Sequence, residues 1–232
     1  MNYQYSYLIG DLIALAIWLL LYLWRKDTRK EMLIISLIFG LIGPLYAIPT
    51  LIDWWNPPNI TNTPIGIEDF LFGFVIGGIS AIIYEEIFKK RVKIRKVKEI
   101  KEKQRNLNIL SLVLLNLGLY FGSFYLLKIN SFFSTVISLA ITIPIIYLKR
   151  KDLIINSLAT GLLITIIGFV GYSLVEIINP GYILFVFNFG EIPKIIILNV
   201  PLYDLIWLFL FGAFIGPLYE YWKEGKLINI KK

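Results

Sequence analysis

Long apolar runs, separated by short charged clusters, extend along the whole chain. A helix needs about 20 mostly apolar residues to cross the ~30 Å hydrocarbon layer of a membrane. Seven runs reach or approach that length. They cover residues 5–24, 32–54, 67–88, 107–127, 131–148, 153–178 and 201–222. The pattern therefore predicts an all-α membrane protein with seven transmembrane helices.

The basic residues predict how these helices are oriented. If the N-terminus is outside, all 23 lysines and arginines except Lys128 and Lys194 lie on the inner side of the membrane. Cytoplasmic loops carry such an excess of basic residues. We therefore expect a multi-pass protein of the cell membrane, with its N-terminus outside and its C-terminus in the cytoplasm. The net charge of +7 then follows from topology, and we expect no nucleic-acid partner.

The densest basic cluster, residues 89–105, has two interpretations. It contains ten basic and two acidic residues. We expect it to be a cytoplasmic linker held near the anionic headgroups of the bilayer, which attract such segments. The alternative is a site for a specific partner.

The composition limits the kinds of functional site that the chain can hold. Charged residues make up 17% of the chain, against roughly 25% in soluble domains, and 57% of the residues are hydrophobic. The chain has no cysteine and no histidine. This excludes disulfides and thiolate metal sites, and it removes the commonest transition-metal ligand and the usual acid–base group near neutral pH.

The sequence contains an internal repeat. Residues 29–41 match residues 150–162, and both Asp53 and Glu176 are followed, three and four positions later, by Asn-Pro. In a second stretch, Asp69, Phe74, Gly77, Tyr84 and Glu85 match Asp204, Phe209, Gly212, Tyr219 and Glu220. These matches predict two parallel three-helix repeats joined through an extra helix. The expected divisions are 1–88 for the first repeat, 89–106 for the basic linker, 107–130 for the spacer helix and 131–232 for the second repeat with its basic tail.

Small residues recur at helical spacing in the third and seventh spans. Gly73 and Gly77 stand four positions apart, as do Gly212 and Gly216. Glycine lets helix backbones approach closely inside a membrane. We expect the third and seventh spans to pack tightly, against each other around a pseudo-two-fold axis. The alternatives are that the glycines make room for a ligand, or that they form contacts with another membrane protein or a second copy.

Acidic residues carry most of the candidate chemistry. Five of them lie at helix ends on the outer side of the predicted topology: Glu68, Asp69, Asp204, Asp53 and Glu176. A carboxyl group kept neutral in an apolar cavity is a usable general acid. The alternative is that these residues cap helices or mark the water interface. Asp11 lies several residues inside the first span, where an ionisable group indicates function.

Other polar and aromatic residues have structural interpretations. Glu85, Glu86 and Glu220 face the basic inner surface, and we expect them to form ion pairs there. Aromatic residues in the third and seventh spans either line a cavity, where their π faces can stabilise a cation, or serve packing. Interface belts are expected from Tyr3, Tyr5, Tyr7, Trp24, Trp54, Trp55 and Trp222.

In the third span, residues 67–72 read Ile-Glu-Asp-Phe-Leu-Phe, and the span ends in Tyr84-Glu85. This span resembles the signature helix of the lycopene cyclase domain family, which comprises small membrane domains of bacterial, archaeal and fungal carotenoid cyclases. In that family an acidic pair opens a phenylalanine-rich helix that ends in Tyr-Glu. Glu68 and Asp69 match the acidic pair. The pattern departs from the family at Gly66, where proline is usual, and at Tyr203, where the second copy lacks its first acid.

The resemblance implies a membrane isomerase that uses no metal and no cofactor. An acid protonates the end of a linear carotene, the carbocation closes a ring, and a base removes a proton. The expected partner is an apolar polyene or isoprenoid. Two alternatives stay open: a non-catalytic binder or carrier of a carotenoid, quinone or lipid, and a scaffold that uses its glycine faces for assembly.

Overall fold

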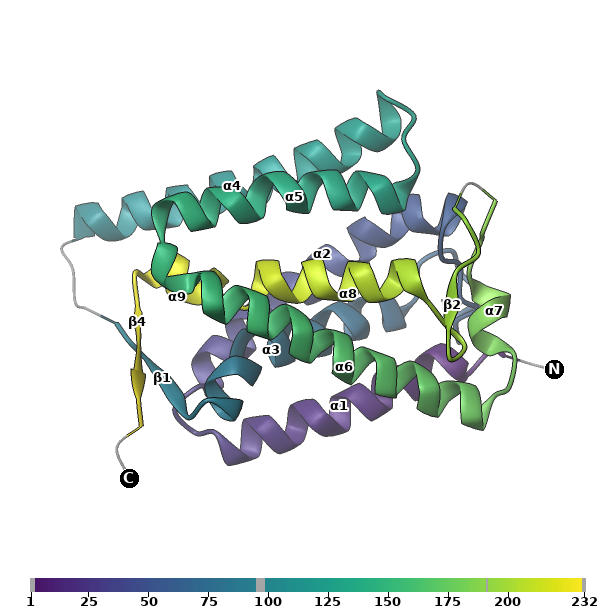
Figure 1. Cartoon of the computed structure of the whole chain (residues 1–232), viewed down its shortest axis with the longest axis horizontal. Helices are drawn as coiled ribbons and strands as arrows, with labels where there is room; N and C mark the ends of the chain where they lie inside the picture. Colours follow the sequence, from purple (N-terminus) through teal and green to yellow (C-terminus); the bar gives the residue numbers. More distant parts are fainter. Residues whose placement is uncertain (1–2, 95–98, 191, 231–232) are drawn as a thin grey trace.

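The computed structural model describes residues 3–94, 99–190 and 192–230, and they form a helical bundle. Within this part of the chain, seven helical segments are long and apolar enough to cross a membrane. They lie side by side with their axes roughly parallel (Figure 1). The segments are α1 (Ser6–Trp24), α2 (Arg29–Asp53), α3 (Ile67–Ile87), α4 (Glu99–Tyr125), α5 (Ser131–Lys149), η1 with α6 (Lys151–Leu153, Ile154–Ile178), and α8 with α9 (Leu202–Ile215, Leu218–Lys223). The predicted multi-pass membrane protein is confirmed.

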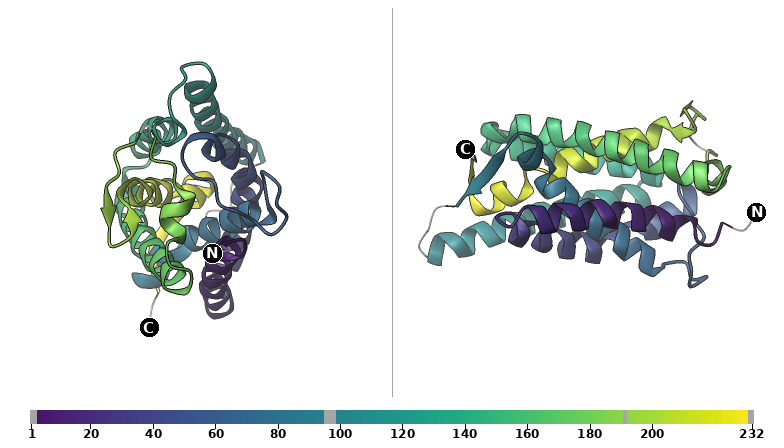
Figure 2. Two further views of the ribbon diagram at one scale, coloured as in Figure 1. Left: turned by 90° about the vertical axis from the view of Figure 1, so that its right-hand side faces the viewer. Right: turned by 90° about the horizontal axis from the view of Figure 1, so that it is seen from below.

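Helix α3 lies at the centre of the bundle. It packs most extensively against α2, and it also contacts α1, α6 and α8. The other principal contact joins α6 to α8, and α4 packs beside α5 at one edge of the bundle (Figures 1 and 2). The apolar core accordingly runs between α3 and α8, with Ile79 and Leu208 almost fully buried. The seventh predicted span is interrupted between α8 and α9, next to Pro217.

Glycines explain why α3 lies so close to α2. A Cβ atom added to Gly73 would collide with the backbone oxygen of Phe39, and one added to Gly43 would collide with the backbone oxygen of Asp69. On α8, Gly212 lies against Ile164 and Gly161 of α6. The predicted tight packing is present, but the glycines of α3 face α2 and those of α8 face α6. The expectation that these glycine faces meet each other was wrong, because each has a partner helix close to it in the chain.

The two ends of the bundle carry different closing elements. At the end that holds the N-terminus, short α7 (Tyr182–Val186) lies beside the hairpin of β2 (Ile196–Ile197) and β3 (Val200–Pro201). At the opposite end, which holds the C-terminus, β1 (Lys90–Lys93) pairs antiparallel with β4 (Lys226–Asn229) (Figure 1). We call these the N-terminal end and the C-terminal end of the bundle. The β1–β4 pair joins the segment after α3 to the segment after α9.

The glycine contact gives a prediction about stability. Gly73→Ala places a methyl group against backbone, which cannot move aside, and overpacking of this kind costs about 1–3 kcal/mol. We expect a lower midpoint of thermal unfolding for the detergent-solubilised protein. Gly118→Ala is the matched control, because a Cβ atom there meets no atom within 4 Å. Equal midpoints for the two variants would contradict this account of the α2–α3 contact.

Candidate functional site

Acidic side chains from three helices are buried at the N-terminal end of the bundle. Glu68 and Asp69 lie in the first turn of α3, and Asp204 lies in the first turn of α8. Both helices start from an extended residue, Gly66 before α3 and Pro201 before α8, so the acids follow directly on the turn into the membrane. Asp11 comes from α1. None of the four acids is more than 4% exposed.

Asp69 is held by two hydrogen-bond donors. The backbone N–H of Gly66 donates to Asp69 Oδ2 over 2.8 Å, and the Tyr7 hydroxyl donates to Asp69 Oδ1 over 3.2 Å. Tyr7 is buried, so it contributes to this site rather than to the interface belt that its position predicted. Donors to both oxygens stabilise a carboxylate, since each bond is stronger to an ionised acceptor.

Asp204 has a different environment. Its Oδ2 atom is buried without a hydrogen-bond partner. The Tyr172 hydroxyl of α6 interacts with the carboxyl group, and both residues line the same cavity. A carboxyl oxygen without a donor in an apolar setting is costly as an anion, and a proton on the group removes that cost. The surroundings of Asp69 therefore favour its carboxylate form, whereas those of Asp204 favour its protonated form.

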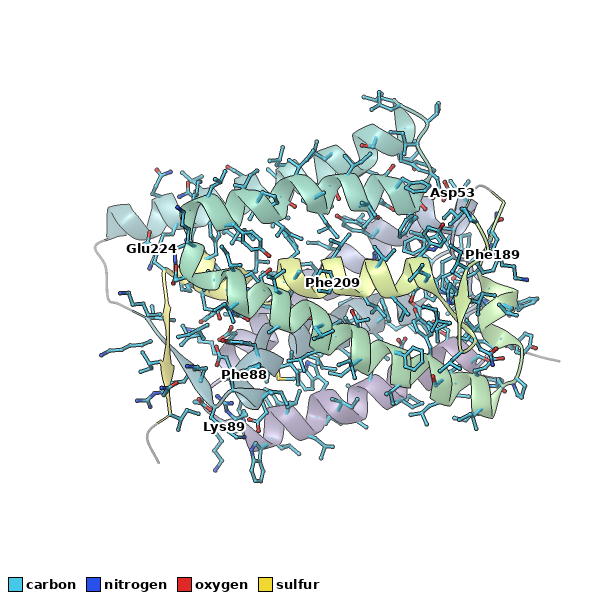
Figure 3. All side chains as sticks on the ribbon, viewed as in Figure 1. Asp53, Phe88, Lys89, Phe189, Phe209 and Glu224 are labelled. Atoms are coloured by element: carbon cyan, nitrogen blue, oxygen red, sulfur yellow. The ribbon has the colours of Figure 1, made fainter. Side chains whose placement is uncertain are left out.

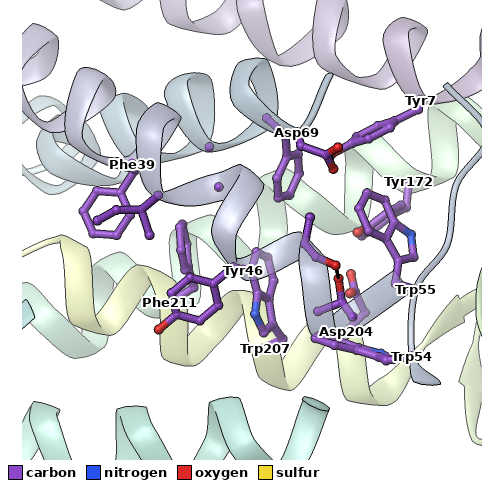
Figure 4. A pocket seen from close by; sticks show the side chains of 16 residues that line it. Tyr7, Phe39, Tyr46, Trp54, Trp55, Asp69, Tyr172, Asp204, Trp207 and Phe211 are labelled. Atoms are coloured by element: carbon purple, nitrogen blue, oxygen red, sulfur yellow. Dashed lines mark hydrogen bonds between the residues drawn. The ribbon is translucent and has the colours of Figure 1, made fainter. Parts of the chain in front are cut away.

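Asp69 and Asp204 share an apolar cavity of about 80 Å³ between α2, α3 and α8. Its wall consists largely of aromatic rings, with Phe72 stacked on Trp207 and Trp207 stacked on Phe211. Figure 4 shows the two acids on the lining among these rings. No lysine or arginine is among the described residues that line the cavity. The site thus presents two acids and several π faces without a basic partner.

A second apolar cavity, of about 240 Å³, adjoins the first between α1 and α6. The two cavities have Tyr7, Trp55, Phe72 and Tyr172 in common. Asp11 lines the second cavity, and neither of its carboxyl oxygens has a hydrogen-bond partner. Burial and the nearby Asp11 raise the pKa of the Tyr182 hydroxyl, so this group of α7 remains neutral. Asp11 stood out in the sequence as an ionisable residue inside an apolar span, and it lies on this second cavity rather than on the one that Asp69 and Asp204 share.

The other three predicted site residues, Glu68, Asp53 and Glu176, accept hydrogen bonds from backbone N–H groups. Glu68 accepts a hydrogen bond from Ile60 N–H over 2.8 Å and so fixes the loop before α3. Asp53 accepts from the N–H and hydroxyl of Ser131, at 3.0 and 2.5 Å, at the start of α5. Glu176 accepts from Gly181 N–H and Ile183 N–H, at 2.7 and 3.1 Å, next to α7. The capping alternative therefore fits Asp53 and Glu176, whereas Glu68 holds a loop and has a second buried oxygen, Oε2, without a hydrogen-bond partner. None of the three lines either cavity.

Asp53 lies at the N-terminal end of the bundle. Figure 3 places it with Phe189 at the N-terminal end, away from Lys89 and Glu224 at the C-terminal end. Among the described residues, one group of carboxyl side chains is close enough to share a metal ion, and it belongs to Glu31, Glu85 and Glu220. These lie at the C-terminal end, outside both apolar cavities.

Comparison with known proteins gives one finding. The family model for lycopene cyclase matches residues 4–87 and 130–222, which is well over half of the chain. The matched residues include Asp69, Asp204 and the helices that carry them, and they leave out the whole of α4. No curated protein and no solved structure matches the chain significantly. The extent of the family match shows that this chain belongs to the lycopene cyclase family.

Proposed function

We propose that this protein is a membrane isomerase that closes a ring at the end of a linear carotene. Family membership supports a carotenoid cyclase-like role in general. The observation that carries the specific proposal is the pair Asp69 and Asp204, which line one apolar cavity from two helices. Ring closure needs an acid and a base in a water-poor, cation-stabilising site, and this cavity offers both groups among aromatic rings.

The two acids have distinct proposed roles. Asp204, with an unpartnered oxygen, enters the reaction as the neutral acid and gives its proton to the substrate. Asp69, with donors to both oxygens, is the carboxylate that removes a proton. Pairs of carboxyl groups whose surroundings favour opposite protonation states divide acid and base work in this way.

The reaction balances without a cofactor, because substrate and product are isomers. Asp204 adds its proton to the terminal double bond of the polyene, which leaves a tertiary carbocation. The electron pair of a nearby double bond attacks that carbon, closes the ring and moves the positive charge to a ring carbon. Asp69 then takes a proton from an adjacent ring carbon, and the electrons of that C–H bond form the new double bond. Before the next turnover, Asp69 releases this proton to solvent and Asp204 takes up a proton from solvent.

The aromatic wall supports the charged stages. A cation over the face of an aromatic ring is stabilised by up to about 2 kcal/mol when water is excluded. Trp207 and Phe211 lie stacked on this wall, and Trp55 lies edge-on to Tyr7. Because the described lining of the cavity is almost entirely apolar, a carbocation formed there meets few nucleophiles other than the substrate itself.

The second cavity gives the substrate a route from the bilayer. It lies between α1 and α6, and its lining includes Ile166, Val170 and Leu174, each at least 40% exposed on the outside of the bundle. These side chains face lipid once the helices span the membrane. A polyene dissolved in the bilayer enters sideways here and reaches Asp69 and Asp204 past Phe72 and Tyr172, which border both cavities.

We further propose that the chain contains two parallel three-helix repeats. Arg25 at the end of α1 forms two hydrogen bonds with Asp27, and Arg150 at the end of α5 forms two with Asp152. In the β1–β4 ladder, Val92 pairs with Leu227, and these residues stand as far apart in sequence as Glu85 and Glu220. Similar contacts in the two halves support a pseudo-two-fold relation between them.

We also propose that the N-terminus of the chain lies outside the cell and its C-terminus in the cytoplasm. Lys128 and Lys194 stand apart from the other basic residues in the sequence, which supports this orientation. The basic C-terminal end then meets anionic headgroups. The acidic cavity lies toward the outer side of the membrane in this arrangement.

Bacteria that accumulate lycopene provide the test of activity. Expression of this chain should convert lycopene to a cyclic carotene, as read by chromatography of the pigments. Asp204→Asn and Asp69→Asn should each lower conversion at least about 100-fold, because each removes an acid–base group. Unchanged lycopene with the wild-type protein present in membranes would overturn the proposal. Lycopene that copurifies unchanged with the wild-type protein would instead favour a non-catalytic carrier.

A capping variant separates stability from chemistry. Asp53→Ala removes the acceptor for Ser131 N–H at the start of α5, and loss of a cap costs about 0.5–2 kcal/mol. We expect a lower thermal midpoint but a rate of cyclisation within about twofold of the wild type when both are folded. If Asp53→Ala lost cyclisation as completely as Asp204→Asn, the division between capping and reacting acids would be incorrect.

A further inference from the structure

Three glutamates from different helices converge at the C-terminal end of the bundle. Glu31 comes from the first turn of α2, Glu85 from the last turn of α3 and Glu220 from α9. One carboxylate oxygen of each lies within 4.8 Å of the corresponding oxygens of the other two. All three residues are buried, and Glu85 and Glu220 are 0% exposed. We call them the three-glutamate cluster.

The cluster has acceptors without donors. Both carboxylate oxygens of Glu85 lack a hydrogen-bond partner, and so do Glu31 Oε1 and Glu220 Oε2. The other carboxylate oxygen of Glu220, Oε1, accepts a hydrogen bond from the Asn156 side chain over 2.7 Å. Buried carboxylates without donors are strongly destabilised unless a cation or a proton joins them. Of the expected ion pairs, Glu86 forms close ones with Arg25 and Lys89 and Glu85 forms a longer one with Arg25, whereas Glu220 forms none with the described residues.

The nearest arginine is already engaged. Arg25 donates to Asp27 over 2.9 and 3.0 Å and to Glu86 over 2.9 Å, and its Nη2 atom lies 3.8 Å from Glu85 Oε2. The hydrogen bond from Arg25 lowers the pKa of Asp27, which keeps that partner charged. Glu86, the acid next to Glu85, also pairs with Lys89. Among the described residues, the ion pair that reaches the cluster is the 3.8 Å contact from Arg25 to Glu85, and Lys30, Arg91 and Lys93 line the cavity beside it.

We propose that the three-glutamate cluster binds one hard divalent cation. Carboxylate oxygens are the ligands that Ca²⁺, Mg²⁺ and Mn²⁺ prefer. Two oxygens on one Ca²⁺, each about 2.3–2.6 Å from the ion, lie at most about 5 Å apart, so the observed spacing fits a shared ion. Two positive charges, together with the Arg25 contact to Glu85, offset three carboxylates. The absence of histidine and cysteine in this chain does not affect such a site, since it needs oxygen alone.

The cluster is accessible from the C-terminal end. Glu31 and Glu85 line a cavity of about 490 Å³, whose other lining residues include Thr28, Tyr219 and residues of β1 and β4. This cavity is polar on much of its surface, unlike the two at the other end of the bundle. An ion enters from the water phase, and in the proposed orientation that phase is the cytoplasm.

A bound ion would join α2 and α3 to α9. These elements belong to the two halves of the chain, which β1 and β4 also connect at this end. The cation is a cross-link between the halves, in addition to the cyclisation chemistry proposed for the N-terminal end. Its binding does not depend on whether the carotene reaction occurs, so the two proposals fail or succeed separately.

Mn²⁺ binding to the detergent-solubilised full chain tests the site. The protein is first treated with a chelator, and Mn²⁺ is then titrated with electron paramagnetic resonance as the readout. We expect one Mn²⁺ per chain, displaced by Ca²⁺ or Mg²⁺, and a higher thermal midpoint when the ion is bound. Binding of no Mn²⁺, Ca²⁺ or Mg²⁺ by the folded wild-type protein would overturn the proposal and leave shared protons as the means by which the cluster is neutralised.

Two neighbouring substitutions locate the ion. Glu85→Gln keeps the shape of the side chain and removes one carboxylate, so we expect Mn²⁺ affinity to fall at least about tenfold. Glu86→Gln is the matched control, because Glu86 pairs with Arg25 and Lys89 outside the cluster. Equal affinities of Glu85→Gln and the wild type would contradict the site. If Glu85→Gln does not fold, Glu31→Gln takes its place, and the wild-type stoichiometry decides independently.

Discussion

The close contact between the backbones of α3 and α2 is the constraint on which both sites depend. Lipid tails are as apolar as leucine, so helices associate in a membrane through close packing rather than through exclusion of water. Gly43 lies directly against the backbone oxygen of Asp69, and Gly73 lies against that of Phe39. One end of α3 therefore carries Asp69 into the apolar cavity, and the other carries Glu85 into the three-glutamate cluster.

The two ends of α3 place similar side chains in different surroundings. At the N-terminal end, carboxyl groups stand among aromatic rings and apolar walls, where a proton or a carbocation is the positive charge that fits. At the C-terminal end, carboxyl groups stand close together beside a polar cavity, where a metal ion fits. Ionisable groups in membrane spans are costly, so buried acids at both ends point to function in each case.

Much of the fold was predictable because it depends on local composition. Span length and polarity alone gave the seven helices, including α5, whose predicted run of 131–148 became Ser131–Lys149. The pairing of β1 with β4 was not predictable, because it joins segments more than 130 residues apart and depends on how the halves pack. The partners of the glycine faces also depend on tertiary packing, which the spacing of small residues does not encode.

The candidate site was predictable in part for the same reason. Asp69 and Asp204 follow from the repeat and the family motif, and both line the cavity. Position at a helix end does not separate such residues from Asp53 and Glu176, whose carboxyl groups bond to backbone N–H groups. Tyr7 resembles an interface residue in the sequence, yet its hydroxyl bonds to Asp69 across 62 positions. A contact between residues so far apart in the sequence can be recognised only from the positions of the helices relative to one another.

Incorporation of solvent deuterium tests the central claim most directly. Membranes that contain this protein would be incubated with linear lycopene in D₂O, and the cyclic product would be examined by mass spectrometry. Because Asp204 exchanges its proton with solvent between turnovers, the account predicts one deuterium in each newly formed ring. A cyclic product without solvent deuterium, or recovery of lycopene alone from membranes that hold the folded protein, would contradict it.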